Sequence, residues 1–239
     1  FMIQSVKFAV PVDHNGEPWL EKQKEIAAGY VTLEQTKETV VEQIANLSQV
    51  SIVPNCDEYA IEYLPLSELF DTIKGKSKYT KKYGNLHSGP YPVYSASSQG
   101  TLTHLDTYDY DGRYMTWSTN GFAGTILILD GKFSINGDRG ILVPKNGRQE
   151  LDFDYMKFTL EPIFRELAKG RKGDNGEDEF TKLYPSMLND IMVPIPIDGE
   201  GNISLSLQKE IAQKFISVQN SQKEIIEKLD ALISKKISI

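Results

Sequence analysis

Residues 10–47 read VPVDHNGEPWLEKQKEIAAGYVTLEQTKETVVEQIANL, and residues 195–232 read IPIDGEGNISLSLQKEIAQKFISVQNSQKEIIEKLDAL. The two stretches align without a gap, so the chain repeats itself at an offset of 185 residues. The run Gln23–Ala27 is identical to Gln208–Ala212, and many other pairs are conservative. A repeat of this length has to be interpreted before any local pattern, because it reflects a repeated structural unit.

Each copy of the repeat predicts the same local structure. A short apolar strand ends in Pro-x-Asp, at Pro11 and Asp13 in the first copy and at Pro196 and Asp198 in the second. A turn with a glycine follows, and the remaining residues are typical of a helix. We expect each aspartate to stabilise its turn, because Asp side chains accept hydrogen bonds from backbone N–H groups close by.

The two predicted helices carry apolar residues at alternating spacings of four and three, which is typical of the a/d seam of a coiled coil. The first seam is Ile26, Tyr30, Leu33, Lys37, Val40, Ile44 and Leu47, and its twin is Ile211, Phe215, Val218, Gln222, Ile225, Leu229 and Leu232. The one polar residue of each seam, Lys37 in the first and Gln222 in the second, occupies the same position in both. We expect an antiparallel coiled coil; the alternative is two unrelated amphipathic helices, each packed on its own core.

Composition indicates an ordinary folded protein with one or two domains. The chain has 239 residues, of which 40% are hydrophobic and 10% aromatic. No apolar run approaches the roughly 20 residues that cross a bilayer, and no basic and apolar leader opens the sequence. The single Cys56 suits a reducing compartment, so we expect a cytoplasmic protein without membrane contact. With one Cys and three scattered His, we expect no metal site and no cofactor.

The net charge of −7 is unfavourable for a nucleic-acid ligand, but the charges are segregated. The lysines 74, 76, 78, 81 and 82 fall within nine residues that contain no acid. A second basic group at residues 165–172 is followed at once by the acidic residues of 174–179. The distribution therefore permits a local phosphate-binding surface on an acidic chain.

The residues between the repeats predict a mixed α/β domain. Strand-like stretches occur at 91–96, 113–118, 124–130, 132–136 and 140–144, with the turn dipeptides Asp111-Gly112 and Asp130-Gly131 between them. Residues 153–168 are helical in texture, and we expect Pro162 to split them. The fold class is therefore α+β, with one mixed α/β domain between two long helices.

No catalytic motif stands out in the sequence. A methyltransferase would need a Gly-rich cofactor turn and an Asn/Asp-Pro-Pro-aromatic motif, and Gly89–Pro92 lacks the amide or acid and the paired prolines. Asp130-Gly131-Lys132 superficially fits a metal-dependent nuclease, but a hairpin turn explains it better. No P-loop is present. We therefore interpret the chain as non-enzymatic.

The candidate site residues are those suited to DNA recognition. Phosphates are contacted by Lys, Arg, Ser and Tyr, and base edges are read by Arg, Asn, Gln, Ser and Thr. The proposed DNA-binding residues are Lys76, Lys78, Tyr79, Lys81, Lys82, Ser95, Ser97, Ser98, Gln99, Asn120, Arg139, Arg171 and Lys172. Gln99 and Arg139 are the proposed base readers. A solvated charge run beside a strand end remains the alternative explanation for residues 74–82.

Several stretches, in this order and with the repeated helix, resemble the specificity subunit of type I restriction–modification systems. They are Leu66–Phe70, Gly75–Lys78, Pro92–Ser97, Gly121–Thr125, Lys132–Ile135, Gly140–Leu142 and Pro194–Pro196 before Gln208–Ala212. In that family two recognition domains each read half of a split DNA target, and two helices packed as an antiparallel coiled coil separate them. The helices dock methyltransferase subunits, which methylate adenine N6, and a restriction subunit joins for cleavage.

The resemblance implies a domain plan and a set of partners. Residues 1–20 would be the tail strand and turn of an upstream unit, 21–48 the first spacer helix, 49–198 the recognition domain and 199–239 the turn and second spacer helix. With one recognition domain, the chain fits a C-terminal fragment, a half-sized subunit that forms a homodimer, or the recognition end of a fused methyltransferase–nuclease. A protein-interaction module whose helices dimerise is the alternative from another class.

Overall fold

In a computed structural model of the chain, the described residues are 9–49, 59–145, 150–172 and 178–233. They fall into two compact units. The first consists of residues Phe1–Val50 and Gln219–Ile239, and the second is the domain Ser51–Val218. The second unit therefore reaches about twenty residues beyond the expected end of the recognition domain at residue 198, because it includes the start of the second long helix. Cys56 lies outside the described residues, as does most of the expected opening strand.

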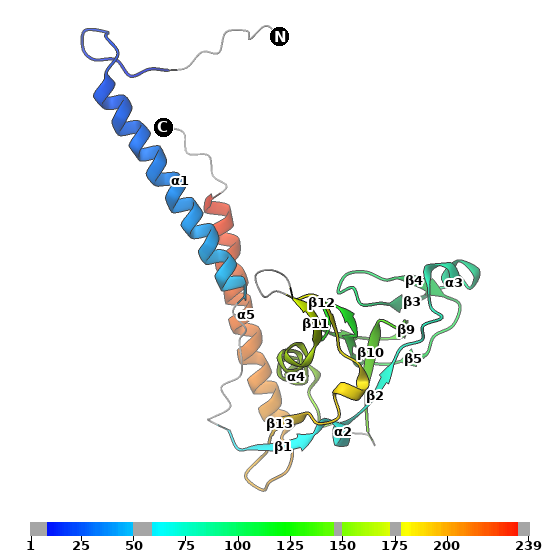
Figure 1. The fold of residues 1–239 in the computed structure, drawn as a ribbon. Coiled ribbons are helices and arrows are strands. Elements are labelled where there is room, and N and C mark those ends of the chain that lie inside the picture. Colours follow the sequence, from blue (N-terminus) through cyan, green and yellow to red (C-terminus); the bar gives the residue numbers. More distant parts are fainter. Residues whose placement is uncertain (1–8, 50–58, 146–149, 173–177, 234–239) are drawn as a thin grey trace. The chain divides into compact units, whose positions relative to one another are not determined.

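The two long helices expected from the repeat are present. Helix α1 spans Leu20–Gln49 and helix α5 spans Leu205–Ile233, and a sheet-rich domain lies between them in the sequence (Figure 1). The expectation of an α+β fold with two flanking helices is confirmed. No helix among the described residues is long and apolar enough to cross a membrane.

Within the first unit, most predicted seam positions of α1 are half-buried, although Tyr30 is exposed, whereas α5 follows its predicted seam only in part. Ile26, Leu33, Lys37, Val40 and Ile44 are half-buried in α1. In α5 the half-buried positions after residue 219 are Gln222, Ile226, Leu229 and Ile233, while Ile225 is 49% exposed. These positions are spaced by four, three and four residues, which still fits a heptad. Gln222 and Leu229 belong to the predicted seam, whereas Ile226 is half-buried in place of Ile225.

The described part of the domain contains four small sheets. The central sheet has the order β2 (Phe70–Lys74), β10 (Arg139–Pro144), β6 (Tyr114–Ser118) and β8 (Ile126–Leu129), all antiparallel. A second sheet has the order β4 (Thr103–Leu105), β3 (Tyr91–Tyr94), β9 (Lys132–Ile135) and β5 (Tyr110–Asp111), with β3 and β9 parallel. The third has the order β11 (Lys169–Lys172), β12 (Asp178–Lys182) and β7 (Asn120–Gly121), and the fourth pairs β1 (Ile61–Pro65) with β13 (Met192–Pro196).

Between β1 and β13, the described residues also form four short or medium helical elements. They are α2 (Leu66–Leu69), α3 (Lys81–Leu86), α4 (Phe153–Leu167) and the 3₁₀ turn η1 (Pro185–Met187). Helix α4 was expected to break at Pro162, and it does not. Proline removes one backbone donor, but α4 buries Tyr155, Leu160 and Phe164 in the core, and this burial outweighs the lost hydrogen bond.

The main core lies between one face of the central sheet, α4 and the start of α5. Trp117 and Leu142 point into it, whereas Ile141 on the opposite face of β10 belongs to a second cluster with Phe133. Ile211, Ala212 and Phe215 of α5 are buried in the same core, and the Phe215 ring stacks on Phe158 with centroids 5.3 Å apart. The beginning of the second repeat helix is thus an integral part of the domain.

Candidate nucleic-acid interface

The turn Asn136–Arg139 is the junction that brings the predicted recognition loops together. The N–H of Gly75 donates to the Arg139 carbonyl at 2.8 Å, and the N–H of Asn136 donates to the Tyr94 carbonyl at 2.9 Å. The N–H of Thr119 donates to the Asp138 carbonyl at 2.9 Å. Three segments far apart in sequence, near residues 75, 95 and 119, therefore converge on one four-residue turn.

Two glycines permit this close convergence. A Cβ at Gly75 would lie 2.1 Å from the carbonyl oxygen of Asn136, and a Cβ at Gly137 would lie 2.6 Å from the hydroxyl of Ser77. Neither position has room for a side chain, because these separations are shorter than van der Waals contact. The start of the lysine-rich segment 75–82, called the basic loop below, is consequently packed directly against the turn.

Arg139 does not lie where a base reader would. Its side chain is fully buried, and its Nε donates to the Ser95 carbonyl at 2.6 Å while its Nη2 donates to the Ser97 carbonyl at 3.0 Å. A third contact runs from Nη1 to the Thr116 hydroxyl at 3.1 Å. Burial lowers the pKa of the guanidinium to about 10, so it remains charged near neutral pH. Arg139 therefore fixes the backbone of residues 95–97 instead of facing solvent.

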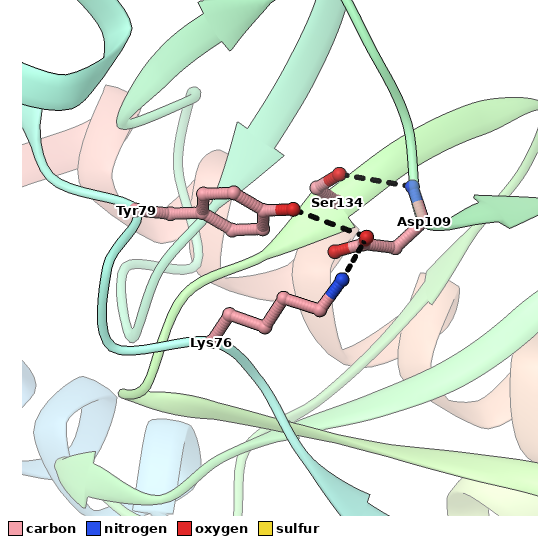
Figure 2. Close-up of polar contacts among 4 residues, drawn as sticks. All are labelled: Lys76, Tyr79, Asp109 and Ser134. Carbon is pink, nitrogen blue, oxygen red and sulfur yellow. Dashed lines mark hydrogen bonds and ion pairs between the residues drawn. The ribbon is translucent and has the colours of Figure 1, made fainter.

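Lys76 and Tyr79 also make internal contacts, which Figure 2 shows. The Lys76 ammonium forms an ion pair with the Asp109 carboxylate, and the Tyr79 hydroxyl donates to the same carboxylate at 3.0 Å. The Asp109 N–H in turn donates to the Ser134 hydroxyl at 3.1 Å. The hydrogen bond to Asp109 raises the pKa of Lys76, and burial followed by the Asp109 bond raises the pKa of Tyr79. Tyr79 is only 4% exposed, so it anchors the basic loop and offers no stacking surface.

The remaining lysines of the basic loop face solvent. Lys78 lies over the Tyr79 ring at 5.4 Å and the Tyr83 ring at 5.5 Å, which restrains its charge near the loop surface. Lys81 and Lys82 are exposed in the first turn of α3. Among the described residues these three cations have no ion partner, whereas Lys76, with a side chain that is 53% exposed, is paired with Asp109.

The loop that follows β3 presents the small polar residues. Ser97, Ser98 and Gln99 are exposed, while Ser95 is half-buried beside Arg139. The Ser97 hydroxyl donates to the Gln99 carbonyl at 2.7 Å and accepts from the Gln99 N–H at 3.1 Å. The backbone at Gln99 is thereby constrained, and its side chain projects from a defined turn.

Asn120 lies on β7 and contacts the same junction. Its Nδ2 donates to one Asp138 carboxylate oxygen at 2.6 Å, and Asn136 Nδ2 donates to the other at 3.2 Å. Asp138 therefore sets the orientation of both amides. Asn120 is half-buried, and an amide side chain is of the kind that reads base edges.

The last two predicted residues lie on β11. Arg171 is exposed on this strand, and the Lys172 side chain lies outside the described residues. Of the thirteen predicted residues, the junction thus gathers those of loops 76–82 and 95–99 together with Asn120 and Arg139. A pocket of about 310 Å³ lies against this junction, and its lining includes Lys74, Ser77, Lys81, Asn136 and Asp138.

Asp109 and Asp138 organise the surface, yet sequence reasoning did not select them. Both are acids, and the search for phosphate-binding residues favoured cations and amides. A carboxylate that orients amides or restrains a lysine has no distinguishing local pattern, because its partners lie between 2 and 33 residues away. The roles of these two aspartates are visible only in the folded structure, which brings their partners close to them.

Comparison with known proteins decides the family. The profile of the family described as "Type I restriction modification DNA specificity domain" matches residues 60–238. The chain belongs to this family. The expected membership in the type I specificity family is therefore confirmed, and the match covers most of the domain and the helix that follows it.

Individual relatives and solved structures agree with the family. The chain is similar to the specificity subunit of the type I restriction enzyme MpnII of Mycoplasma pneumoniae, at 29% identity over 64% of this chain and 43% of the relative. It is also similar to a candidate type I specificity subunit of the same organism, at 38% identity over 64% of this chain and 59% of the relative. This chain therefore spans less than two thirds of these relatives.

Two solved structures share the fold. An S subunit from M. genitalium gives a TM-score of 0.52 at 16% identity, over 70% of this chain and 41% of that one. An HsdS subunit from Thermoanaerobacter tengcongensis gives a TM-score of 0.54 at 14% identity, over 91% and 57%. At such low identity the likeness concerns the fold alone, and it agrees with a sheet-rich domain that has a long helix before it and a long helix after it in the sequence.

Proposed function

We propose that this chain is a non-catalytic DNA-recognition subunit that reads one half of a split double-stranded target. The observation that carries the proposal is the junction at Asn136–Arg139, which supports a lysine-bearing loop and a serine- and glutamine-bearing loop together with Asn120. Phosphate contacts position a protein on DNA, and amide and hydroxyl side chains read base edges. Lys78, Lys81 and Lys82 would supply the former, and Gln99 and Asn120 the latter.

The long helices would serve assembly. In the proposed complex they pack as an antiparallel coiled coil and dock adenine-N6 methyltransferase subunits, with a restriction subunit added for cleavage. Membership in the specificity family supports this role. The apolar Tyr30, Val31 and Val41 exposed on α1 are suited to burial against partner subunits. A second copy of the chain could supply the other half of the target, because one recognition domain reads one half.

Salt dependence of DNA binding tests the recognition surface. Replacing Lys78, Lys81 and Lys82 together by Gln should make the slope of log affinity against log salt shallower by up to about 3, because each phosphate contact contributes roughly 0.9. Affinity should fall similarly for target and random duplexes, since phosphates carry no sequence. The matched control replaces Lys132, Lys145 and Lys157 by Gln, which removes the same charge from elsewhere in the domain.

The measurement uses the full chain, alone and with its methyltransferase subunit. We expect weak binding by the chain alone and much tighter binding in the complex. Equal slopes for wild type, triple variant and control would show that the basic loop is a solvated surface. If neither the chain nor the complex binds any duplex, the protein-interaction module becomes the better explanation.

A further inference from the structure

The three-stranded sheet β11-β12-β7 has one face of which the proposed recognition surface uses only Asn120. Its register places Lys169 opposite Lys182, Arg171 opposite Phe180, and Lys182 opposite Asn120. Directly paired residues of antiparallel strands point to the same face, and so do residues two apart on one strand. The side chains of Lys169, Arg171, Phe180, Lys182 and Asn120 therefore all lie on one face.

The opposite face of this sheet is internal, which fixes the direction in which the basic face points. Thr181, between Phe180 and Lys182, is fully buried. Its hydroxyl donates to the Gly121 carbonyl at 3.0 Å and accepts from the Ala123 N–H at 3.1 Å. The alternation along β12 thus sends Phe180, which is 50% exposed, and Lys182 outward to solvent.

The charged side chains described on this outer face are basic. Lys169 and Lys182 are exposed, and among the described residues neither side-chain ammonium has a hydrogen bond or an ion pair. Arg171 has another contact of its own, so the two lysines carry the argument. Two lysines held opposite each other on neighbouring strands repel, because like charges directly opposite are destabilising. An anionic ligand would relieve this repulsion.

The outer face is continuous with the junction at Asn136–Arg139. Asn120, paired with Lys182, donates to Asp138 of that turn at 2.6 Å. Lys74, which precedes the basic loop, lies over the ring of Tyr184 at 5.0 Å, two residues beyond Lys182. The sheet face and the basic loop are therefore neighbouring parts of one surface, with Asn120 between them.

We propose that the outer face of β11-β12-β7 is a second DNA-backbone contact, in which Lys169 and Lys182 bind phosphates and Asn120 reads an adjacent base edge. This inference rests on the proposed function and adds to it. Phe180 supplies apolar contact to a sugar or to a thymine methyl group. The two basic surfaces bind phosphates on either side of Asn120, which fixes the position of its amide on the duplex.

The test replaces Lys169 and Lys182 together by Gln in the full chain with its methyltransferase subunit. The slope of log affinity against log salt should become shallower by about 2, at roughly 0.9 per phosphate contact, for both target and random duplexes. The control replaces Lys132 and Lys145 by Gln; these lysines pair with Asp111 and Asp71 on other strands, at 3.9 and 3.3 Å. An unchanged thermal midpoint in both variants establishes that each is folded.

A second variant, Asn120→Ala, distinguishes base reading from phosphate contact. It should weaken binding to the target about tenfold or more, with little change for random duplex and no change in salt slope. If wild type binds DNA and the Lys169/Lys182 variant keeps the full slope, the second contact surface is wrong while the proposed function stands. If wild type shows no salt-dependent DNA binding, both the second contact surface and the proposed function are wrong.

Discussion

The two copies of the repeat share one sequence pattern and have very different surroundings. In the second copy Gln208, Ile211 and Phe215 are buried in the core of the specificity domain. Their equivalents in the first copy are Gln23, Ile26 and Tyr30, of which the first two are half-buried and Tyr30 is 44% exposed. The same pattern therefore forms a helix in both places, while the energy gained from that helix depends on what covers it.

The turns before the two helices differ far less than the helices do. Gly16 and Gly201 have positive φ angles of 84° and 85°, and each aspartate accepts two backbone hydrogen bonds. Each turn also closes with an isolated β-bridge, Val12 with Pro18 and Ile197 with Ile203. The comparison separates what is encoded locally, the turn and the helix, from what depends on tertiary contacts, the burial of the helix face.

The largest expected difference between the copies concerns one aromatic position. Phe215→Ala should lower the free energy of unfolding of the domain by about 3–5 kcal/mol, because a buried ring that stacks on Phe158 is lost. Tyr30→Ala should change it by less than about 0.5 kcal/mol. Urea unfolding followed by the fluorescence of buried Trp117 measures the domain, in a Trp19→Phe background that removes the tryptophan before α1. Equal losses for the two variants would contradict the comparison.

The next difference concerns a buried amide. Gln208 Nε2 donates to the Glu150 carbonyl at 2.8 Å, and Gln208 Oε1 accepts from the Asp152 N–H at 2.9 Å. Gln208→Ala leaves both backbone groups without this partner and should cost about 2–3 kcal/mol. Gln23→Ala, its twin, should be close to neutral. The same urea unfolding experiment applies, and hydrogen exchange at the Asp152 amide should accelerate only in the Gln208 variant.

Sequence reasoning succeeded where the determinants are local. The repeat predicted both long helices, and the Pro-x-Asp and glycine pattern predicted both turns. The five strand-like stretches between residues 91 and 144 correspond to β3, β6, β8, β9 and β10. Their pairing was beyond reach, because the parallel contact of β3 with β9 joins residues about forty apart, and no local pattern encodes it.

The candidate site shows the same division. The exposed Lys78, Lys81 and Gln99 are where the polar loop pattern suggested. Arg139, in a glycine-flanked polar turn, looked like an exposed reader but is buried by the backbone of residues 95–97, more than forty positions earlier. Tyr79 looked like a stacking residue but is anchored by Asp109, thirty positions later. Non-local partners decided both outcomes.

A smaller effect concerns which of two neighbouring residues is half-buried in each long helix. Val40 is half-buried and Val41 is 52% exposed in α1, whereas the equivalent Ile225 is exposed and Ile226 half-buried in α5. Val40→Ala and Ile226→Ala should each lower the free energy of unfolding by about 1 kcal/mol, whereas Val41→Ala and Ile225→Ala should leave it nearly unchanged. Circular dichroism of the helical signal during thermal unfolding measures this. A larger loss of stability for Ile225→Ala than for Ile226→Ala would instead favour the seam predicted from the sequence.

The smallest expected effect concerns the two turns, where the copies should behave alike. Asp198 accepts hydrogen bonds from the backbone N–H groups of Glu200 and Asn202, both at 2.9 Å. Asp13 accepts from Asn15 at 2.8 Å and from Glu17 at 3.0 Å. Substituting either aspartate by Ala should therefore loosen its own turn to a similar, small extent, detectable as faster hydrogen exchange of the N–H groups that it accepts from.

The stability of the second turn should also depend on pH, because its aspartate can be protonated. The hydrogen bonds from Asn202 and Glu200 lower the pKa of Asp198 in the folded chain below its ordinary value near 3.8. A carboxylate with a depressed folded pKa stabilises the folded state above its unfolded pKa, and this contribution is lost as the pH falls through the folded pKa. The turn should thus stay closed at neutral pH and open only below about pH 4. Carboxyl chemical shifts followed by NMR through that range measure the titration, and an ordinary or raised pKa for Asp198 would mean that the turn does not bind its carboxylate in solution.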